Sequence, residues 1–248
     1  MSPPTSPERP RGAFVGGLLV VVMLLGGVFV LHPGAEYDDL RRLFGFGQDR
    51  LSAPLPVREG SGTYEFLHTQ RGSDEPVSYS PCRPVRYAVN PQQAPDDHME
   101  LIQGSVARIE QATGLVFEYV GETTSRNFLA RSLAGDPVLI GWATPEELPQ
   151  LEDEVAGIGG STMVSRQLGR REYVTGMVAL DAETFQELMG SPSGRAHAAA
   201  ILDHELAHLV GLDHVDDEGE LMHPRGASRG EFGPGDLEGL ARLGAIEC

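Results

Sequence analysis

The sequence predicts an α+β domain, with helices packed on one β-sheet, between residues 63 and 248 of a 248-residue chain. Alternating apolar and polar side chains, typical of strands, dominate the first two thirds of this region, and helical spacing dominates the last third. Hydrophobic residues make up 40% of the chain and charged residues 22%, which is typical of a globular protein and not of a disordered one.

The first predicted elements are two strands and a helix. TYEFLH at 63–68 alternates, and VRYAVN at 85–90 places its apolar side chains on one face. Residues 95–113 then change to helical spacing, and Gly114 can end that helix because glycine adopts positive φ at little cost.

Four more strands and two helices complete the predicted domain. The strands are expected at 115–120, 137–143, 161–165 and 173–181, with a long loop rich in glycine and acidic residues at 144–160. Ser191 and Pro192 provide an N-cap and a first-turn proline for a helix that reaches about residue 211. A short last helix is expected at 235–244, after Pro234.

The N-terminal segment is predicted to cross a membrane once. Residues 13–31 contain no charge, and a helix of this length extends about 28 Å, close to the thickness of a bilayer's hydrocarbon core. Arg9 and Arg11 precede the span and favour a cytoplasmic N-terminus. The prediction is therefore a cytoplasmic tail at 1–12, a transmembrane signal anchor at 13–31, a juxtamembrane linker or short pro-segment at 32–62, and a domain at 63–248 outside the cell. Cleavage of the anchor would instead give a secreted protein.

Charge and cysteine content exclude several classes of protein. The net charge is −17, which argues against nucleic-acid binding because phosphate contacts need a basic face. Cys82 and Cys248 are too few for a thiolate zinc finger. In an oxidising compartment they could pair and tie the C-terminus to the start of the folded domain, and the alternative is two buried free thiols.

The segment HELAHLVGLDH at 204–214 carries the chemistry. His204 and His208 are four residues apart, so on a helix their imidazoles lie on one face, as two ligands of one metal ion require. Gly211 can end the helix and turn the chain, which would return His214 as a third ligand. Three protein ligands leave a fourth position open, and this arrangement is typical of catalytic zinc sites rather than structural ones.

This segment resembles the zinc signature of the metzincin metallopeptidases. Met222 and Pro224 are similar to the Met-turn of the matrixin branch, although Val215 stands where serine is usual and His223 where tyrosine is usual. The resemblance implies a twisted mixed β-sheet with an active-site helix, a Met-turn and a C-terminal helix. It also implies that Met222 forms an apolar floor beneath the three imidazoles.

The resemblance implies a zinc-dependent endopeptidase. The span at 13–31 would anchor it at the cell surface, and a monomer is the default expectation. One Zn²⁺ ion would be bound, and Glu205 would act as the general base that takes a proton from water. A peptide or protein substrate would lie extended along an edge strand. By analogy of position, that strand comprises Gly160, Ser161, Thr162, Met163, Val164 and Ser165.

Three alternatives stay open at this point. The chain could be a catalytically inactive zinc-binding surface module that recognises a protein partner, although a pure binding site does not need Glu205. It could also be a zinc amidase or another zinc hydrolase with similar chemistry. The acidic loop at 144–160 leaves bound Ca²⁺ possible but unsupported.

Overall fold

The structure is a computed structural model. It describes residues 49–248 apart from 58, 61, 130–134, 154, 167–168 and 225–229, and these residues pack as one unit. The predicted tail at 1–12 and the predicted span at 13–31 lie outside the described residues, as does the first part of the linker predicted at 32–62.

The predicted membrane location is wrong for the part of the chain that the structure describes. None of the described helices is both long enough and apolar enough to cross a bilayer. The longest, α5 (Pro192–Val210), carries Arg195, Asp203 and Glu205 among its 19 residues, and charged side chains are costly in hydrocarbon. We therefore do not carry the single-pass membrane location further.

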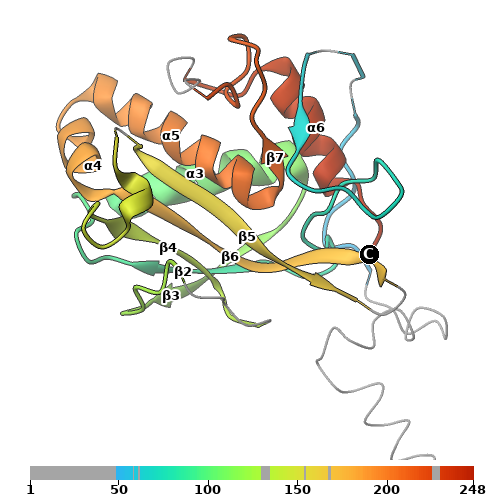
Figure 1. The fold of residues 1–248 in the computed structure, drawn as a ribbon, viewed down its shortest axis with the longest axis horizontal. Helices are drawn as coiled ribbons and strands as arrows, with labels where there is room; N and C mark the ends of the chain where they lie inside the picture. The colour runs from blue at the N-terminus through green and yellow to red at the C-terminus, as the bar shows by residue number, and fades with distance from the viewer. Residues whose placement is uncertain are drawn as a thin grey trace, which may run out of the picture. The chain divides into compact units, whose positions relative to one another are not determined.

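A five-stranded sheet forms one layer of the unit (Figure 1). Its strands lie in the order β3-β2-β4-β6-β5. Neighbours are parallel except β5, which pairs antiparallel with β6 at one edge. The strand bounds are β2 (Val85–Asn90), β3 (Phe117–Glu122), β4 (Val138–Ala143), β5 (Gly157–Ser165) and β6 (Arg171–Asp181). The predicted mixed sheet with packed helices is confirmed at this level.

Four α-helices in the described part of the chain accompany the sheet, and α3 and α5 cover one of its faces (Figure 1). Their bounds are α3 (His98–Thr113), α4 (Ala182–Met189), α5 (Pro192–Val210) and α6 (Pro234–Gly244). Local sequence explains their ends. Gly114 closes α3 at φ 73°, and the Ser191 hydroxyl at the start of α5 accepts a hydrogen bond from the Gly194 N–H at 3.1 Å.

Some predicted elements differ from the structure. The strand expected at 63–68 is reduced to β1 (Glu65–Phe66), which pairs only with the two-residue β7 (Leu212–Asp213). The loop expected at 144–160 contains a 3₁₀ turn at Pro149–Leu151 and the first residues of β5. Helix α4 was not predicted, although the Asp181 carboxylate caps it by accepting a bond from the Thr184 N–H at 2.8 Å.

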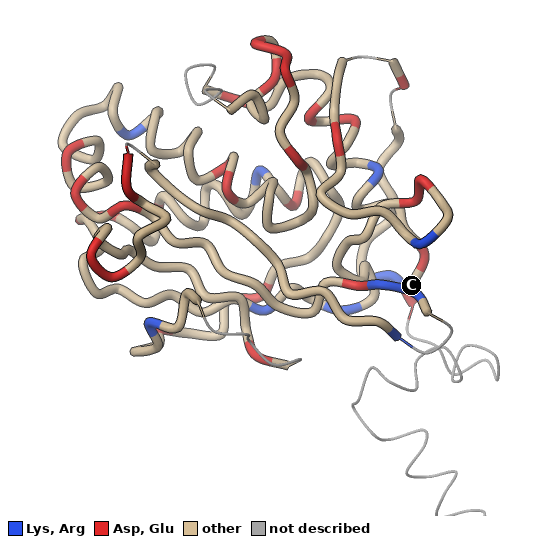
Figure 2. Tube along the Cα trace, in the orientation of Figure 1, with Lys and Arg blue, Asp and Glu red and all other residues tan. Residues whose placement is uncertain are grey.

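The main hydrophobic core lies between the sheet and the helices. Its largest fully buried side chains include Trp142 on β4, Tyr173 on β6 and Leu206 on α5. A second cluster contains Leu139 and Ala143, whose positions on β4 have the opposite parity to Trp142. Because side chains alternate along a strand, this second cluster lies on the other face of the sheet. Acidic residues are spread over the whole unit, while several arginines lie near the C-terminus (Figure 2).

Candidate metal centre

Three imidazoles converge at the end of α5. His204 and His208 lie one turn apart on the helix, and His214 follows the short strand β7. The Nε2 atom of His214 is 3.1 Å from the Nε2 atoms of both His204 and His208. Among the described residues, this is the one group of three or more potential ligand side chains whose ligand atoms lie together. The structure thus brings together the three histidines that the sequence predicted as ligands.

Backbone carbonyls fix the tautomers of two of these rings. The Nδ1 atom of His204 lies 2.8 Å from the Leu221 carbonyl oxygen, and that of His208 lies 2.8 Å from the Leu212 carbonyl oxygen. A carbonyl oxygen only accepts hydrogen bonds, so each Nδ1 carries the proton and donates it. Each Nε2 atom therefore presents a lone pair to the centre of the group, which is the usual arrangement of metal-bound histidine.

The geometry fits a single tetrahedral metal ion. Metal–nitrogen bonds of about 2.0–2.1 Å at tetrahedral angles would separate two ligand nitrogens by about 3.3 Å, close to the 3.1 Å in the structure. Without a cation between them, lone pairs at this distance would repel one another. Burial lowers the pKa of His204 to about 3 and that of His208 to about 4, and neighbouring histidines add to both shifts. Both rings are therefore neutral at neutral pH, as metal ligation requires.

Gly211 ends α5 and allows the chain to return. Its φ is 127°, and its N–H is bonded to the carbonyls of Ala207 and His208. A Cβ atom at this position would lie 3.0 Å from both the Val77 carbonyl oxygen and Leu243 Cδ2, so any larger residue would be crowded as well as strained. The turn that the sequence predicted at Gly211 is present.

Glu205 is buried, and it directly follows His204 in the sequence. Its side chain is 7% exposed, and burial raises its pKa to about 8, while a hydrogen bond from the Gly159 backbone opposes the increase. A carboxyl group with such a pKa can gain or lose a proton near neutral pH.

Two buried carboxylates that the sequence reasoning missed fix the loop after His214. Asp236 accepts bonds from the N–H groups of Leu221 at 2.5 Å and Met222 at 3.3 Å. Glu220 accepts bonds from the N–H groups of Gly235 and Asp236 at 2.9 Å, at the N-terminus of α6. These bonds between the loop and α6 hold the Leu221 carbonyl in place, and that carbonyl orients His204. The place of Asp236 in the first helical turn is a capping-box signal that could have indicated it.

The predicted Met-turn residues are mostly buried. Met222 is 1% exposed in the main core cluster, which also contains Val215 and Leu206. The Met222 carbonyl accepts a bond from the Val215 N–H at 3.1 Å, so the loop folds back beside the third histidine. His223 is 8% exposed, and Pro224 lies at the surface.

Asp203, the residue before His204, forms an ion pair that anchors α5. Asp203 is 1% exposed and is held by Arg108 of α3 through two contacts, Nε to Oδ2 at 2.6 Å and Nη2 to Oδ1 at 3.1 Å. Such a bidentate pair fixes the relative orientation of the two side chains, and thereby the position of α5 against α3. Nothing in the spacing of Arg108 and Asp203 relates the two residues, so this pair could not be predicted from the sequence.

The predicted substrate strand lies at one edge of the sheet. It is part of β5, which begins at Gly157, three residues before the predicted Gly160–Ser165 segment. Ser161 faces α5, because its hydroxyl donates to the Leu209 carbonyl at 2.6 Å and contacts the Tyr79 hydroxyl at 2.5 Å. The strand therefore runs beside the helix that carries the histidines (Figure 1).

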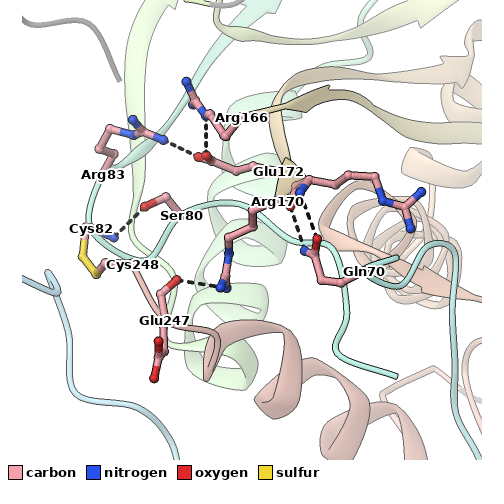
Figure 3. A network of polar contacts seen from close by, with 10 residues as sticks. Gln70, Ser80, Cys82, Arg83, Arg166, Arg170, Glu172, Glu247 and Cys248 are labelled. Carbon is pink, nitrogen blue, oxygen red and sulfur yellow. Dashed lines mark hydrogen bonds and ion pairs between the residues drawn. A yellow bond between two sulfur atoms is a disulfide. The ribbon is translucent and has the colours of Figure 1, made fainter. Parts of the chain in front are cut away.

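Cys82 and Cys248 are joined by a disulfide bond, with their Cα atoms 5.7 Å apart. Figure 3 shows it beside an ion-paired group in which Glu172 contacts both Arg83 and Arg166. It ties the last residue to the segment before β2, and thus lies beyond the C-terminal end of α6.

Comparisons with known proteins add little to this description. No protein-family model and no curated protein matches the sequence. One solved structure, described as the GM1 bound form of the ECX AB5 holotoxin, aligns over 77% of this chain and 92% of that chain. The TM-score is 0.43 and the identity 11%, so this alignment carries no argument about fold or function. The three-histidine group remains the feature on which any function must be argued.

Proposed function

We propose that this protein is a zinc-dependent endopeptidase of the metzincin type. The observation that carries the proposal is the convergence of three Nε2 lone pairs at the end of α5, on which the buried Glu205 directly follows His204. Three nitrogen donors without a sulfur donor suit zinc, and three protein ligands suit a catalytic rather than a structural site. The Gly211 turn and the buried Met222 are consistent with the metzincin resemblance.

The proposed reaction assigns one role to each group. When bound, zinc supplies Lewis acidity that polarises a carbonyl group and lowers the pKa of a water molecule. Glu205 takes the proton of the attacking water and delivers it to the amine that leaves. The carbonyls of Leu221 and Leu212 keep His204 and His208 in the tautomer that leaves Nε2 free.

The proposed substrate is an extended peptide. Strand β5 is an edge strand, and in antiparallel pairing its outward N–H and C=O groups can bond a further strand. It lies beside α5, the helix that carries His204 and His208. Residues Gly160 to Ser165 remain the proposed pairing segment.

The decisive test is Glu205→Ala in the full chain. Zinc content should stay at one ion per chain, while hydrolysis of a peptide library should fall by about 10²- to 10⁴-fold because the proton acceptor is lost. Glu187→Ala on α4 is the control, because Glu187 is an exposed acidic residue remote from the histidines in sequence. Retained hydrolysis in Glu205→Ala would refute the role of Glu205 as the general base. If the wild type and Glu205→Ala both bind zinc and neither hydrolyses peptides, a non-catalytic zinc module would be favoured.

A further inference from the structure

We infer that Gly157 and Gly159 of β5 are positioning residues for Glu205. Because they have no side chains, the edge strand can lie directly on the helix at Glu205 and confine its carboxyl group. The inference rests on the proposed function for the meaning of Glu205, but the packing on which it depends is independent of that function.

The closest contacts at these two glycines are with Glu205, and Leu180 Cδ2 also lies 3.2 Å from the Cβ position at Gly157. A Cβ atom on Gly157 would lie 2.8 Å from Glu205 Cγ and 3.2 Å from Glu205 Cδ. A Cβ atom on Gly159 would collide with the backbone carbonyl of Glu205 and lie 3.0 Å from its Cα. Real Cβ atoms essentially never approach other heavy atoms more closely than 3.0 Å. Alanine at Gly157 would therefore displace the Glu205 side chain, and alanine at Gly159 would push the strand off the helix.

The strand is held at this distance one helical turn further along. Side chains alternate along a strand, so Ser161 faces α5 together with Gly157 and Gly159. Its hydroxyl donates to the Leu209 carbonyl at 2.6 Å, and Leu209 lies four residues after Glu205 on α5. Close contact at Glu205 and a hydrogen bond at Leu209 thus seat β5 on two successive turns of the helix.

This seating has a consequence for the base. Glu205 is only 7% exposed, and β5 lies directly against it at Gly157 and Gly159. The same strand offers the proposed pairing edge for the substrate, so one rigid element would locate both the base and the peptide. A base displaced by about 1 Å can lose about 10²-fold in rate.

The test is Gly157→Ala in the zinc-loaded full chain. The atoms that its methyl group meets belong largely to the flexible side chain of Glu205, so the variant should fold and keep one zinc ion per chain. We expect kcat to fall by about 10- to 100-fold with KM changed by less than about threefold. A crystal structure should show the Glu205 carboxyl displaced and the three Nε2 atoms unmoved.

The matched control is Gly194→Ala on the same helix. A Cβ atom there would lie 2.0 Å from the Leu188 carbonyl oxygen, so this variant is overpacked more severely than Gly157→Ala, but at the opposite end of α5 from Glu205. Its kcat per folded molecule should equal that of the wild type. Unchanged kcat in Gly157→Ala, or an equal loss in Gly194→Ala, would overturn the inference.

A second measurement does not depend on activity or on the variant's folding. In ¹⁵N-glycine spectra, Glu205→Gln should shift the amide signals of Gly157 and Gly159 but not that of Gly104 on α3, where a Cβ would have room. Absence of any shift at Gly157 and Gly159 would refute the contact. If the wild type binds zinc but cleaves nothing, the proposed function fails, while these shifts still test the packing.

Discussion

Removal of the Cys82–Cys248 disulfide should lower global stability without altering the metal centre. The bond joins residues 166 apart in sequence. In the chain-entropy model, closing a loop of this length removes about 17 cal/mol/K from the unfolded chain, or about 5 kcal/mol at 25 °C. Removal of native disulfides typically costs 2–5 kcal/mol, so we expect the double variant Cys82→Ser/Cys248→Ser to lose an amount in this range.

The assay is urea unfolding of the two metal-free proteins, with zinc titration of each in parallel. Zinc affinity should change by less than about threefold. The disulfide lies beyond the C-terminal end of α6, whereas Asp236, which holds the loop after His214, is at the N-terminal end of this helix. The Arg50 side chain, which donates to the carbonyls of Gly244 and Ile246 at 2.6 and 2.7 Å, should hold the C-terminus in the folded variant. A loss below about 1 kcal/mol would refute the chain-entropy reasoning.

Three further predictions concern buried charge and metal. Arg108→Ala should cost about 3–5 kcal/mol by leaving Asp203 buried and unpaired, whereas Arg195→Ala, which breaks an exposed pair, should cost less than about 1 kcal/mol in the same urea assay. Burial raises the pKa of Asp236 from 3.8 to about 6, so its stabilising effect is complete below about pH 4 and is lost as the pH rises through 6. Relative to Asp236→Asn, the wild type should lose about 2–3 kcal/mol between pH 4 and 7, and a pH-independent difference would contradict this. Chelation should lower the free energy of unfolding by about 4 kcal/mol, relative to protein with free zinc at about 1,000 times its Kd, and calorimetry measures this change.

The ligand set could be predicted from sequence because its geometry is local. Histidines four residues apart on a helix must share a face, and a glycine after the helix allows a sharp turn. These relations hold before any tertiary contact forms, and the structure places His204, His208 and His214 together. Most of the order of strands and helices was also predictable, because apolar segments bounded by turn and capping residues mark the long elements, although β4 and the second half of α5 are buried on every side.

The supporting contacts could not be predicted because they join residues that are distant in sequence. Asp203 meets Arg108 across 95 residues, and Leu221 meets Asp236 from another element. No periodic or spacing signal relates the two members of either pair, although the place of Asp236 in the first turn of α6 is a capping-box signal for Asp236 itself. Similarly, the sequence shows that Gly157 and Gly159 are glycines in a loop-like segment, but only the packing of β5 on α5 gives a reason for their small size.

The predicted strand at 63–68 was too long because alternation shows which residues can form a strand but not whether a partner is available. In the structure only Glu65 and Phe66 form a strand ladder, with the two-residue strand β7, while Leu67 and His68 make single backbone bonds to Gly211 and Val77. The membrane location was predicted from residues 13–31 and the arginines before them, and none of the described helices is both long and apolar enough to cross a bilayer.

The central claim is that three histidine nitrogens hold one zinc ion in a catalytic site. X-ray absorption of the zinc-loaded full chain measures this most directly. We expect one zinc per chain with three imidazole nitrogens at about 2.0–2.1 Å, one oxygen neighbour and no sulfur, and no bound zinc in His208→Gln at equimolar metal. Sulfur in the first coordination shell, a fourth protein ligand, or full zinc binding in His208→Gln would contradict the account.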